Sequence, residues 1–283
     1  MKFKAFASTG VELPVIGQGT WNMPESGAGR KEAQRALRRG IELGMVHVDT
    51  AEMYGSGRVE ELLGEAISGA PRERLFIATK VLPSNASYAG TIAAADRSLR
   101  RLQCEYLDLF LLHWPGEHPL AETMRAFDRL VEEGKVRFVG VSNFDARQMA
   151  EAASHLRGTH LACNQVLYHL GERGIEHELR EAASRYGIAT VAYTPFGRGS
   201  FLRAGGARRE TLQRVARKHA ATVRQVALAF LIRDPAVFAI PKAARVEHVE
   251  ENAGAAELEL DAQDAAAIDA AFPRGEPGPL ATL

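Results

Sequence analysis

The sequence is poor in cysteine, has no excess of either charge and contains no long apolar run. Its two cysteines, Cys104 and Cys163, lack the spacing of metal ligands, and so few thiols in 283 residues are typical of a reducing compartment. Thirty-five basic residues balance thirty-five acidic ones, which disfavours nucleic acid and anionic membranes as partners. No run of about eighteen apolar residues occurs, and residues 1–10 do not resemble a signal peptide. We therefore expect a soluble, cytoplasmic protein.

Apolar runs with strand character alternate with amphipathic helical stretches along almost the whole chain. Eight runs have this strand character, and they are Val15 to Gly19, Val46 to Asp49, Leu75 to Lys80, Leu107 to His113, Val136 to Ser142, Ala162 to Gln165, Ile188 to Tyr193 and Val237 to Ile240. Between them apolar residues recur at intervals of three and four, as in the stretches Arg30 to Leu43, Ala89 to Leu102, Ala121 to Glu133, Ala146 to His155 and Glu176 to Tyr186. Several stretches end in glycine, at Gly44, Gly134 and Gly187.

Eight such units predict an α/β fold, a (β/α)8 TIM barrel with a short N-terminal β-hairpin around Thr9 and Gly10. A doubly wound open sheet has the same alternation, but its dinucleotide-binding form carries G-x-G-x-x-G after the first strand. That turn is absent, because Gly17-Gln18-Gly19-Thr20 leads into Trp21 and Asn22 and not into a helix. No linker and no internal repeat divides the chain, so we expect a single domain over residues 1–283.

Polar residues stand at the end of one predicted strand after another. The second, third and fourth strands end in Asp49, Lys80 and His113, and the later ones end in Ser142-Asn143, Asn164-Gln165 and Tyr193-Thr194. Taken singly, Asp49 is explained as a turn cap, Lys80 as a solvated charge and His113 as a core histidine. Because active sites of β/α barrels lie at the carboxyl ends of the strands, the group together, with Tyr54 in the loop after Asp49, predicts an active site.

This group of side chains suits carbonyl chemistry. The pKa of tyrosine is ordinarily about 10, so its use as a proton donor near neutrality calls for a neighbour that favours the phenolate. Lys80 close to Tyr54 would lower the tyrosine pKa, and Asp49 would keep Lys80 charged. A neutral His113 could hydrogen-bond and polarise the substrate carbonyl. Since no side chain can donate hydride, we expect a nicotinamide cofactor.

Several motifs resemble those of the aldo-keto reductase family. They are Asp49 to Gly55 (DTAEMYG), Lys80, Leu112 to Pro115 (LHWP), Gly140 to Phe144 (GVSNF), Asn164 to Val166 (NQV), Tyr193 to Gly199 (YTPFGRG), Ile240 to Lys242 (IPK) and Glu251-Asn252. They span nearly the whole chain in order, which makes the resemblance specific. It implies a tetrad of Asp49, Tyr54, Lys80 and His113, with Tyr54 as the general acid of carbonyl reduction.

The resemblance also implies a set of cofactor contacts. Ser142, Asn143 and Gln165 would hold the nicotinamide carboxamide, and Tyr193 would stack on the ring. The pyrophosphate and adenosine end would lie against the remaining members of two segments, which are Thr194, Pro195, Phe196, Gly197, Arg198 and Gly199 in the first and Pro241, Lys242, His248, Glu251 and Asn252 in the second.

Lys242, near the start of a helix predicted from about Val246, is suited to an extra phosphate on the adenosine ribose, so NADP(H) is preferred to NAD(H). The sequence departs from the family pattern at two positions here. His248 stands where many members have arginine, although Arg245 lies one turn earlier, and Ala243 replaces a frequent hydroxyl residue.

The expected substrate is a small carbonyl compound. The loop after His113 is short and the tail after Phe272 is short and rich in proline and glycine, so we expect a shallow pocket. Trp21, Met23, Met53 and Trp114 could form its apolar wall. Within the family, the segments Gly17 to Trp21, Asn164 to Gly171 and Ile240 to Ala244 look most like small bacterial reductases of methylglyoxal and related aldehydes, which suggests a role in detoxification.

Three other functions are compatible with parts of this pattern. Lys80 could form a Schiff base with an aldehyde, but a lysine held charged by Asp49 is a poor nucleophile. His47, Asp49 and His113 could hold a metal, although a metal hydrolase normally has more histidines at strand ends, and we expect no metal. A nicotinamide-binding sensor or scaffold without turnover is the alternative that would have no need of Tyr54. The family resemblance also favours a monomer.

Overall fold

The structure, a computed structural model, describes residues 1–199 and 206–283. The chain opens with an antiparallel hairpin, β1 (Phe3–Ala5) and β2 (Glu12–Pro14). Eight parallel strands follow and pair in chain order, and they are β3 (Gln18–Gly19), β4 (His47–Asp49), β5 (Phe76–Val81), β6 (Leu107–Leu112), β7 (Val136–Ser142), β8 (Leu161–Leu167), β9 (Ala189–Tyr193) and β10 (Val237–Ala239). The predicted strands and the N-terminal hairpin are therefore confirmed, with shifts at their ends.

Two parallel bridges close the sheet between its first and last strands. They join Ile16 to Ala239 and Gly19 to Lys242. Glycine is required at this seam because a Cβ atom on Gly19 would lie 2.6 Å from the carbonyl oxygen of Ile240. The Gly17-Gln18-Gly19 sequence thus serves barrel closure, and the prediction of a (β/α)8 TIM barrel is confirmed.

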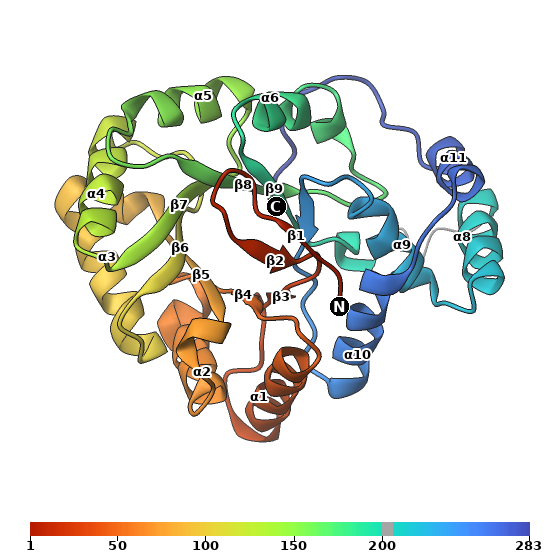
Figure 1. Cartoon of the computed structure of the whole chain (residues 1–283), viewed down its shortest axis with the longest axis horizontal. Coiled ribbons are helices and arrows are strands. Elements are labelled where there is room, and N and C mark those ends of the chain that lie inside the picture. Colours follow the sequence, from red (N-terminus) through yellow and green to blue (C-terminus); the bar gives the residue numbers. More distant parts are fainter. Residues whose placement is uncertain (200–205) are drawn as a thin grey trace.

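Helices form a ring outside the strands (Figure 1). Their bounds are α1 (Gly27–Glu42), α2 (Arg58–Ile67), α3 (Tyr88–Leu102), α4 (Leu120–Glu132), α5 (Ala146–His155), α6 (Leu179–Arg185), α8 (Ala207–Lys218), α9 (Val223–Leu231), α10 (Val246–Gly254) and α11 (Ala262–Ala271). The helix expected over Glu176 to Tyr186 is instead a 3-10 turn, η4 (Gly174–Glu176), followed by α6. Another 3-10 turn, η1 (Tyr54–Gly57), precedes α2.

Glycine at the predicted helix ends has the expected conformation. The φ angles of Gly44, Gly134 and Gly187 are +89°, +70° and +64°. These left-handed values are easy for glycine, which has no Cβ atom, and they turn the chain from each helix toward the next strand.

The N-terminal hairpin covers one end of the barrel (Figure 1). Phe6 is fully buried, and its ring contacts those of Phe76 and Phe238 at centroid distances of 5.6 and 5.2 Å. Phe76 is the first residue of β5, so the covered end is the amino-terminal end of the strands. The polar strand-end residues lie at the opposite, carboxyl end.

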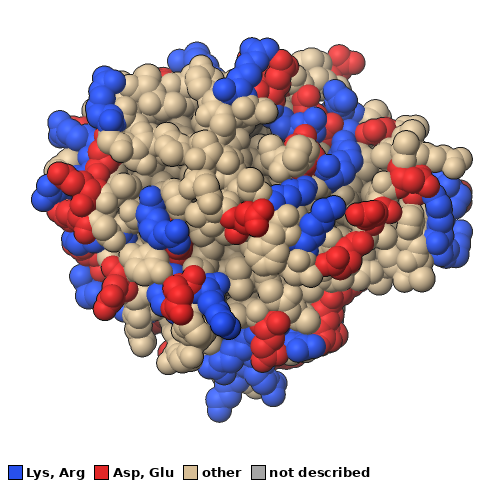
Figure 2. Space-filling view, viewed as in Figure 1, with Lys and Arg blue, Asp and Glu red and all other residues tan. Residues whose placement is uncertain are grey.

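Charged side chains of both signs are interspersed on the face seen in Figure 2. The distribution on this face fits the balanced composition. Within the described ranges, no helix has both the length and the apolar character needed to cross a bilayer.

Candidate active site

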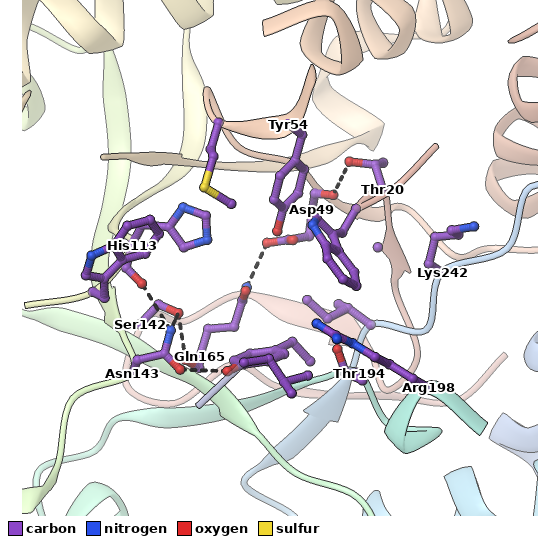
Figure 3. A pocket seen from close by; sticks show the side chains of 17 residues that line it. Thr20, Asp49, Tyr54, His113, Ser142, Asn143, Gln165, Thr194, Arg198 and Lys242 are labelled. Atoms are coloured by element: carbon purple, nitrogen blue, oxygen red, sulfur yellow. Dashed lines mark hydrogen bonds between the residues drawn. The ribbon is translucent and has the colours of Figure 1, made fainter. Parts of the chain in front are cut away.

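A pocket opens at the carboxyl ends of the strands (Figure 3). It collects residues from every part of the barrel, and its lining is Gly19, Thr20, Trp21, Asp49, Met53, Tyr54, His113, Trp114, Ser142, Asn143, Gln165, Tyr193, Thr194, Arg198, Ile240, Lys242 and Leu283. Thirteen of these were singled out from the sequence. The structure thus brings together side chains that lie far apart along the chain.

Lys80 lies fully buried below the pocket and joins the acid to the tyrosine. Its Nζ donates to Asp49 Oδ2 and to the carbonyl oxygen of Thr50, each at 2.7 Å, and to Tyr54 Oη at 3.3 Å. The second carboxylate oxygen of Asp49 accepts from Gln165 Nε2 at 2.7 Å. Every hydrogen of this buried ammonium therefore has an acceptor, which is the condition for keeping a charge in the interior.

The pKa of Lys80 reflects this network. Burial alone would lower the pKa, but Asp49 and Tyr54 together raise it above its ordinary value. The lysine therefore stays protonated at neutral pH. A protonated amine cannot attack a carbonyl, so the geometry argues against the Schiff-base alternative.

The sequence predicts that Lys80 lowers the pKa of Tyr54, but the net pKa in the structure is raised. Burial is the larger effect and raises the pKa of Tyr54 above its ordinary value, while the charge and hydrogen bond of Lys80 act in the opposite direction. The burial of the phenol depends on packing that no local sequence pattern reveals. At neutral pH Tyr54 is consequently a protonated donor whose conjugate base has a cation beside it.

His113 faces Tyr54 across the pocket, with ring centroids 5.9 Å apart (Figure 3). Burial, and then the charge of Lys80, lower the pKa of His113 to about 2. The imidazole is therefore neutral at physiological pH, as the sequence analysis expected. A neutral ring beside the phenol can hydrogen-bond an oxygen atom placed between them without adding charge.

Amide and hydroxyl groups form a connected row beside this centre. Tyr193 Oη donates to Asn143 Oδ1 at 2.8 Å, and Asn143 Nδ2 contacts Ser142 Oγ and the carbonyl oxygen of His113, both at 3.2 Å. Asn143 has a φ of +61°, and Thr194, just after β9, has a φ of +50°. Positive φ at residues other than glycine is uncommon and is found most often where a site constrains the backbone.

The mouth of the pocket has an apolar wall. Trp21, Met53 and Trp114 are 38%, 38% and 36% exposed, which is unusual for such large apolar side chains. Arg198 lies over the Trp21 ring, with its Cζ atom 4.8 Å from the ring centroid. Three of the four predicted wall residues therefore line the opening, whereas Met23 is buried and lies outside the lining.

Leu283 and Thr20 were missed by the sequence analysis. The tail after Phe272 returns to the barrel mouth, so Leu283 lines the pocket. The expectation of a shallow pocket stays a prediction. A proline- and glycine-rich tail has no periodicity from which its path could be predicted. Thr20 donates to the carbonyl oxygen of Asp49 at 2.9 Å, and the Gly17 to Trp21 motif could have indicated it.

Lys242 lines the pocket at the end away from His113 (Figure 3). Lys242 is an exposed residue, yet the partial desolvation of its ammonium lowers its pKa. The helix expected near it is α10, which begins at Val246. Arg245 precedes this helix and donates from Nη2 to His248 Nε2 at 2.6 Å.

The other residues expected at this end do not belong to the pocket lining. Glu251 Oε2 is 3.5 Å from Arg224 Nη1, Asn252 is buried in α10, and the Arg224 Cζ atom lies 5.6 Å from the centroid of the Phe196 ring. The remaining ones, Pro195, Gly197, Gly199 and Pro241, belong to the segments that carry Arg198 and Lys242.

His47 does not share the pocket with His113. It packs in the covered end of the barrel, edge-on to Phe76 at a ring distance of 5.3 Å. The three residues of the metal alternative are therefore divided between the two ends.

The barrel and the pocket define an enzyme fold with a tyrosine–lysine–aspartate centre at the carboxyl ends of its strands. A family model described as "Aldo/keto reductase family" matches residues 15–272. The chain belongs to this family and is an oxidoreductase.

Relatives and solved structures cover nearly the whole chain. The methylglyoxal reductase YeaE of Escherichia coli is 44% identical over 263 residues, covering 93% of this chain and 92% of its own. The glyoxal reductase of Bacillus subtilis is 36% identical, covering 92% and 90%. An aldo/keto reductase of Klebsiella pneumoniae, crystallised with NADP and acetate, is 41% identical with a TM-score of 0.93 and full coverage of both chains.

Proposed function

We propose that this protein uses NADPH to reduce small aldehydes and ketones to alcohols, with 2-oxoaldehydes such as methylglyoxal among its substrates. The observation that carries the proposal is the position of Tyr54 Oη, which lies at the pocket 3.3 Å from a lysine that Asp49 keeps charged. Relatives named as methylglyoxal and glyoxal reductases support the choice of substrate.

The donors and acceptors in the pocket fit a nicotinamide. Ser142, Asn143 and Gln165 offer one hydroxyl and two amides, which match the hydrogen-bonding needs of a carboxamide. The flat ring of Tyr193 lies in the same lining and suits stacking. When bound there, the cofactor would supply the hydride, which no side chain can provide.

Side chains of the protein would supply the proton and stabilise the charges that its transfer creates. The carbonyl oxygen of the substrate would lie between Tyr54 and His113, and Tyr54 Oη would donate its proton to that oxygen as negative charge develops. Lys80 would stabilise the tyrosinate that remains, and neutral His113 would hold the oxygen by a hydrogen bond. Trp21, Met53 and Trp114 would hold the apolar part of the substrate and exclude water.

Lys242 supports the choice of NADPH over NADH. A lysine whose ammonium is partly desolvated gains from an anionic partner, and the extra phosphate on the adenosine ribose of NADPH is such a group. Arg198, Phe196 and the rest of the Thr194 to Gly199 segment, with Pro241, His248, Glu251 and Asn252, would complete the contacts of the pyrophosphate and adenosine.

The test is the loss of reduced-nicotinamide absorbance with methylglyoxal and with bulky steroid and sugar ketones. It is run in parallel with NADPH and NADH, for the parent enzyme and Tyr54→Phe, and cofactor binding is followed by fluorescence. We expect NADPH to be oxidised rapidly with methylglyoxal, and Tyr54→Phe to lower the rate by about 1,000-fold with a nearly unchanged cofactor Kd.

Each of the other possible outcomes would reject one part of the proposed function. Equal rates with bulky ketones would reject the substrate class, and preference for NADH would reject the role of Lys242. Tight cofactor binding without reduction, unaffected by Tyr54→Phe, would establish the sensor alternative.

Four expectations from the sequence stay predictions. They are a single domain over residues 1–283, a cytoplasmic location, a monomeric state and a role in detoxification. Size-exclusion chromatography with light scattering tests the monomer. A 30.8 kDa species supports it, and a multiple of that mass contradicts it.

A further inference from the structure

Two buried carboxylates flank Tyr54 in the chain, and arginines of one helix hold both. Glu52 lies just before Tyr54 and Glu60 lies in the first turn of α2, and their side chains are 5% and 0% exposed. Arg97 Nη2 is 3.0 Å from Glu52 Oε2, and Arg101 Nη1 is 3.0 Å from Glu60 Oε2. The two arginines are one turn apart on α3, so they share a face of that helix.

The same carboxylates also bind the strand that carries Lys80 and the loop that follows it. Thr79, the residue before Lys80, donates from Oγ1 to Glu60 Oε1 at 2.7 Å. The backbone N–H of Leu82 donates to Glu52 Oε1 at 2.8 Å, and Asn85 Nδ2 donates to the same oxygen at 2.9 Å. Each carboxylate therefore links the segment around Tyr54 to the segment around Lys80 and to α3.

The segment after Tyr54 has a backbone that needs such support. Gly55, Ser56 and Gly57 have φ angles of +56°, +55° and +93°. A Cβ atom on Gly57 would lie 2.4 Å from Arg101 Cζ, so the guanidinium rests against this turn. Consecutive left-handed residues that include a serine persist only where the surroundings fix them.

We propose that Arg97 and Arg101, acting through Glu52 and Glu60, are positioning residues that hold the Tyr54 hydroxyl at its hydrogen-bond distance from Lys80. None of the four residues belongs to the pocket lining, so they act through Tyr54 and not on substrate or cofactor. The α2 and α3 helices pack against one another on the outside of the barrel (Figure 1), which places the arginines behind the turn. The proposal rests on the proposed role of Tyr54 as general acid.

Loss of Arg101 would leave the buried carboxylate of Glu60 without its cationic partner. Glu60 would keep its charge in the interior with only Thr79 as a partner, and a buried unpaired charge is avoided by rearrangement. Because the first turn of α2 directly follows the left-handed residues, that rearrangement would move Tyr54. A displacement of about 1 Å at a reacting group can cost about 100-fold in rate.

The test compares Arg101→Met, Glu60→Gln and the double variant with Arg100→Met, a matched change on an exposed position of the same helix. For Arg101→Met we expect kcat for aldehyde reduction to fall by about 10- to 100-fold, while the NADPH Kd from fluorescence stays within about twofold. The pH profile of kcat should also shift, because the proton affinity of Tyr54 depends on its distance from Lys80. Arg101→Lys should restore part of the loss.

A double-mutant cycle separates positioning from general destabilisation. If Arg101 acts through Glu60, the double variant should lose no more kcat than the worse single variant, whereas independent effects would multiply. If Arg101→Met does not fold, the kcat of Thr79→Val and Glu60→Gln tests the proposal instead. Both variants keep Arg101 and weaken the contacts of the Glu60 carboxylate.

The proposal is overturned if Arg101→Met lowers kcat no more than Arg100→Met does, or only in proportion to the folded fraction in thermal denaturation. It is also overturned if the pH profile of kcat is unchanged. Failure of the proposed function is distinguishable, because Tyr54→Phe would then leave the parent activity intact.

Discussion

The two ends of the barrel contain similar buried groups in different surroundings. Strand β4 supplies His47 to the covered end and Asp49 to the open end, only two residues apart. At the covered end His47 packs against phenylalanine rings, and neither ring nitrogen has a hydrogen-bond partner among the described residues. At the open end the buried Lys80 has three acceptors.

The difference shows that one end of the barrel contributes to stability and the other end holds the groups suited to a reaction. Burial opposes charge at both ends, and it lowers the pKa of His47 to about 4. At the open end Asp49 and Tyr54 raise the pKa of Lys80, so its charge persists there. The covered end therefore contributes apolar packing, and the open end keeps a cation where a reaction could use it.

Lys80→Met should give the largest effect, because it removes the charge that distinguishes the open end. We expect kcat for aldehyde reduction to fall by about 1,000-fold, since the tyrosinate formed from Tyr54 would have no cation beside it. Steady-state kinetics measures the loss, with Lys31→Met, a change of an exposed lysine, as the control.

Cofactor binding and thermal denaturation must accompany that measurement. Loss of Lys80 leaves Asp49 buried with Gln165 as its remaining side-chain partner, which costs stability as well as rate. If the folded variant reduced aldehydes at the parent rate, the open end would not be the chemical centre.

Phe6→Ala tests the covered end in the same way. Removing a fully buried ring should lower the free energy of unfolding by about 3–5 kcal/mol. The kcat of the folded enzyme should stay within about twofold, since Phe6 lies at the end opposite Tyr54. Phe3→Ala, which changes a phenylalanine that is 43% exposed on the same hairpin, should cost below about 1 kcal/mol in denaturant unfolding. A large drop in kcat for Phe6→Ala would show that the two ends are coupled.

The two ends also differ in how well the sequence predicts them. The alternation of apolar runs and helical stretches was enough for the barrel, because each strand buried on both faces is a short continuous apolar run. The strand-end positions then placed Asp49, Lys80 and His113 at one mouth, since parallel strands all point the same way.

What the sequence could not predict is which partner each side chain selects. Gln165 donates to Asp49, which is 116 residues away, and this pairing depends on barrel geometry that no local pattern encodes. The net pKa of Tyr54 was unpredictable for the same reason, because burial outweighs Lys80 only once the packing is known. Leu283 reaches the pocket through an irregular tail, and irregular segments have no period to extrapolate.

Lys242→Met sharpens the comparison at the edge of the open end, where the lysine is exposed and only partly desolvated. We expect the Kd of NADPH to rise by about 10- to 100-fold, because the variant loses one charge-assisted hydrogen bond to the extra phosphate. The Kd of NADH should change by less than about twofold. Fluorescence titration of both cofactors gives the ratio. An equal loss for both would show that Lys242 stabilises the pocket without contacting the extra phosphate.

His47→Leu should give the smallest effect at neutral pH, because the charge of this group affects stability only on acidification. The unfolded chain binds a proton to His47 below its ordinary pKa of about 6.5, whereas the folded protein does so only near pH 4. The unfolded state therefore holds more protons in this interval, so the full stability is present above about pH 6.5 and falls as the pH drops toward 4.

The contribution of this one group is at most about 3 kcal/mol. Urea unfolding at pH 7 and pH 4.5 should show a smaller loss of stability for His47→Leu than for the parent, with His160→Gln, a change of an exposed histidine, matching the parent. An identical acid dependence in His47→Leu and the parent would mean that the covered end admits a proton or water to the imidazole. The contrast between a dry end and a polar end would then have to be abandoned.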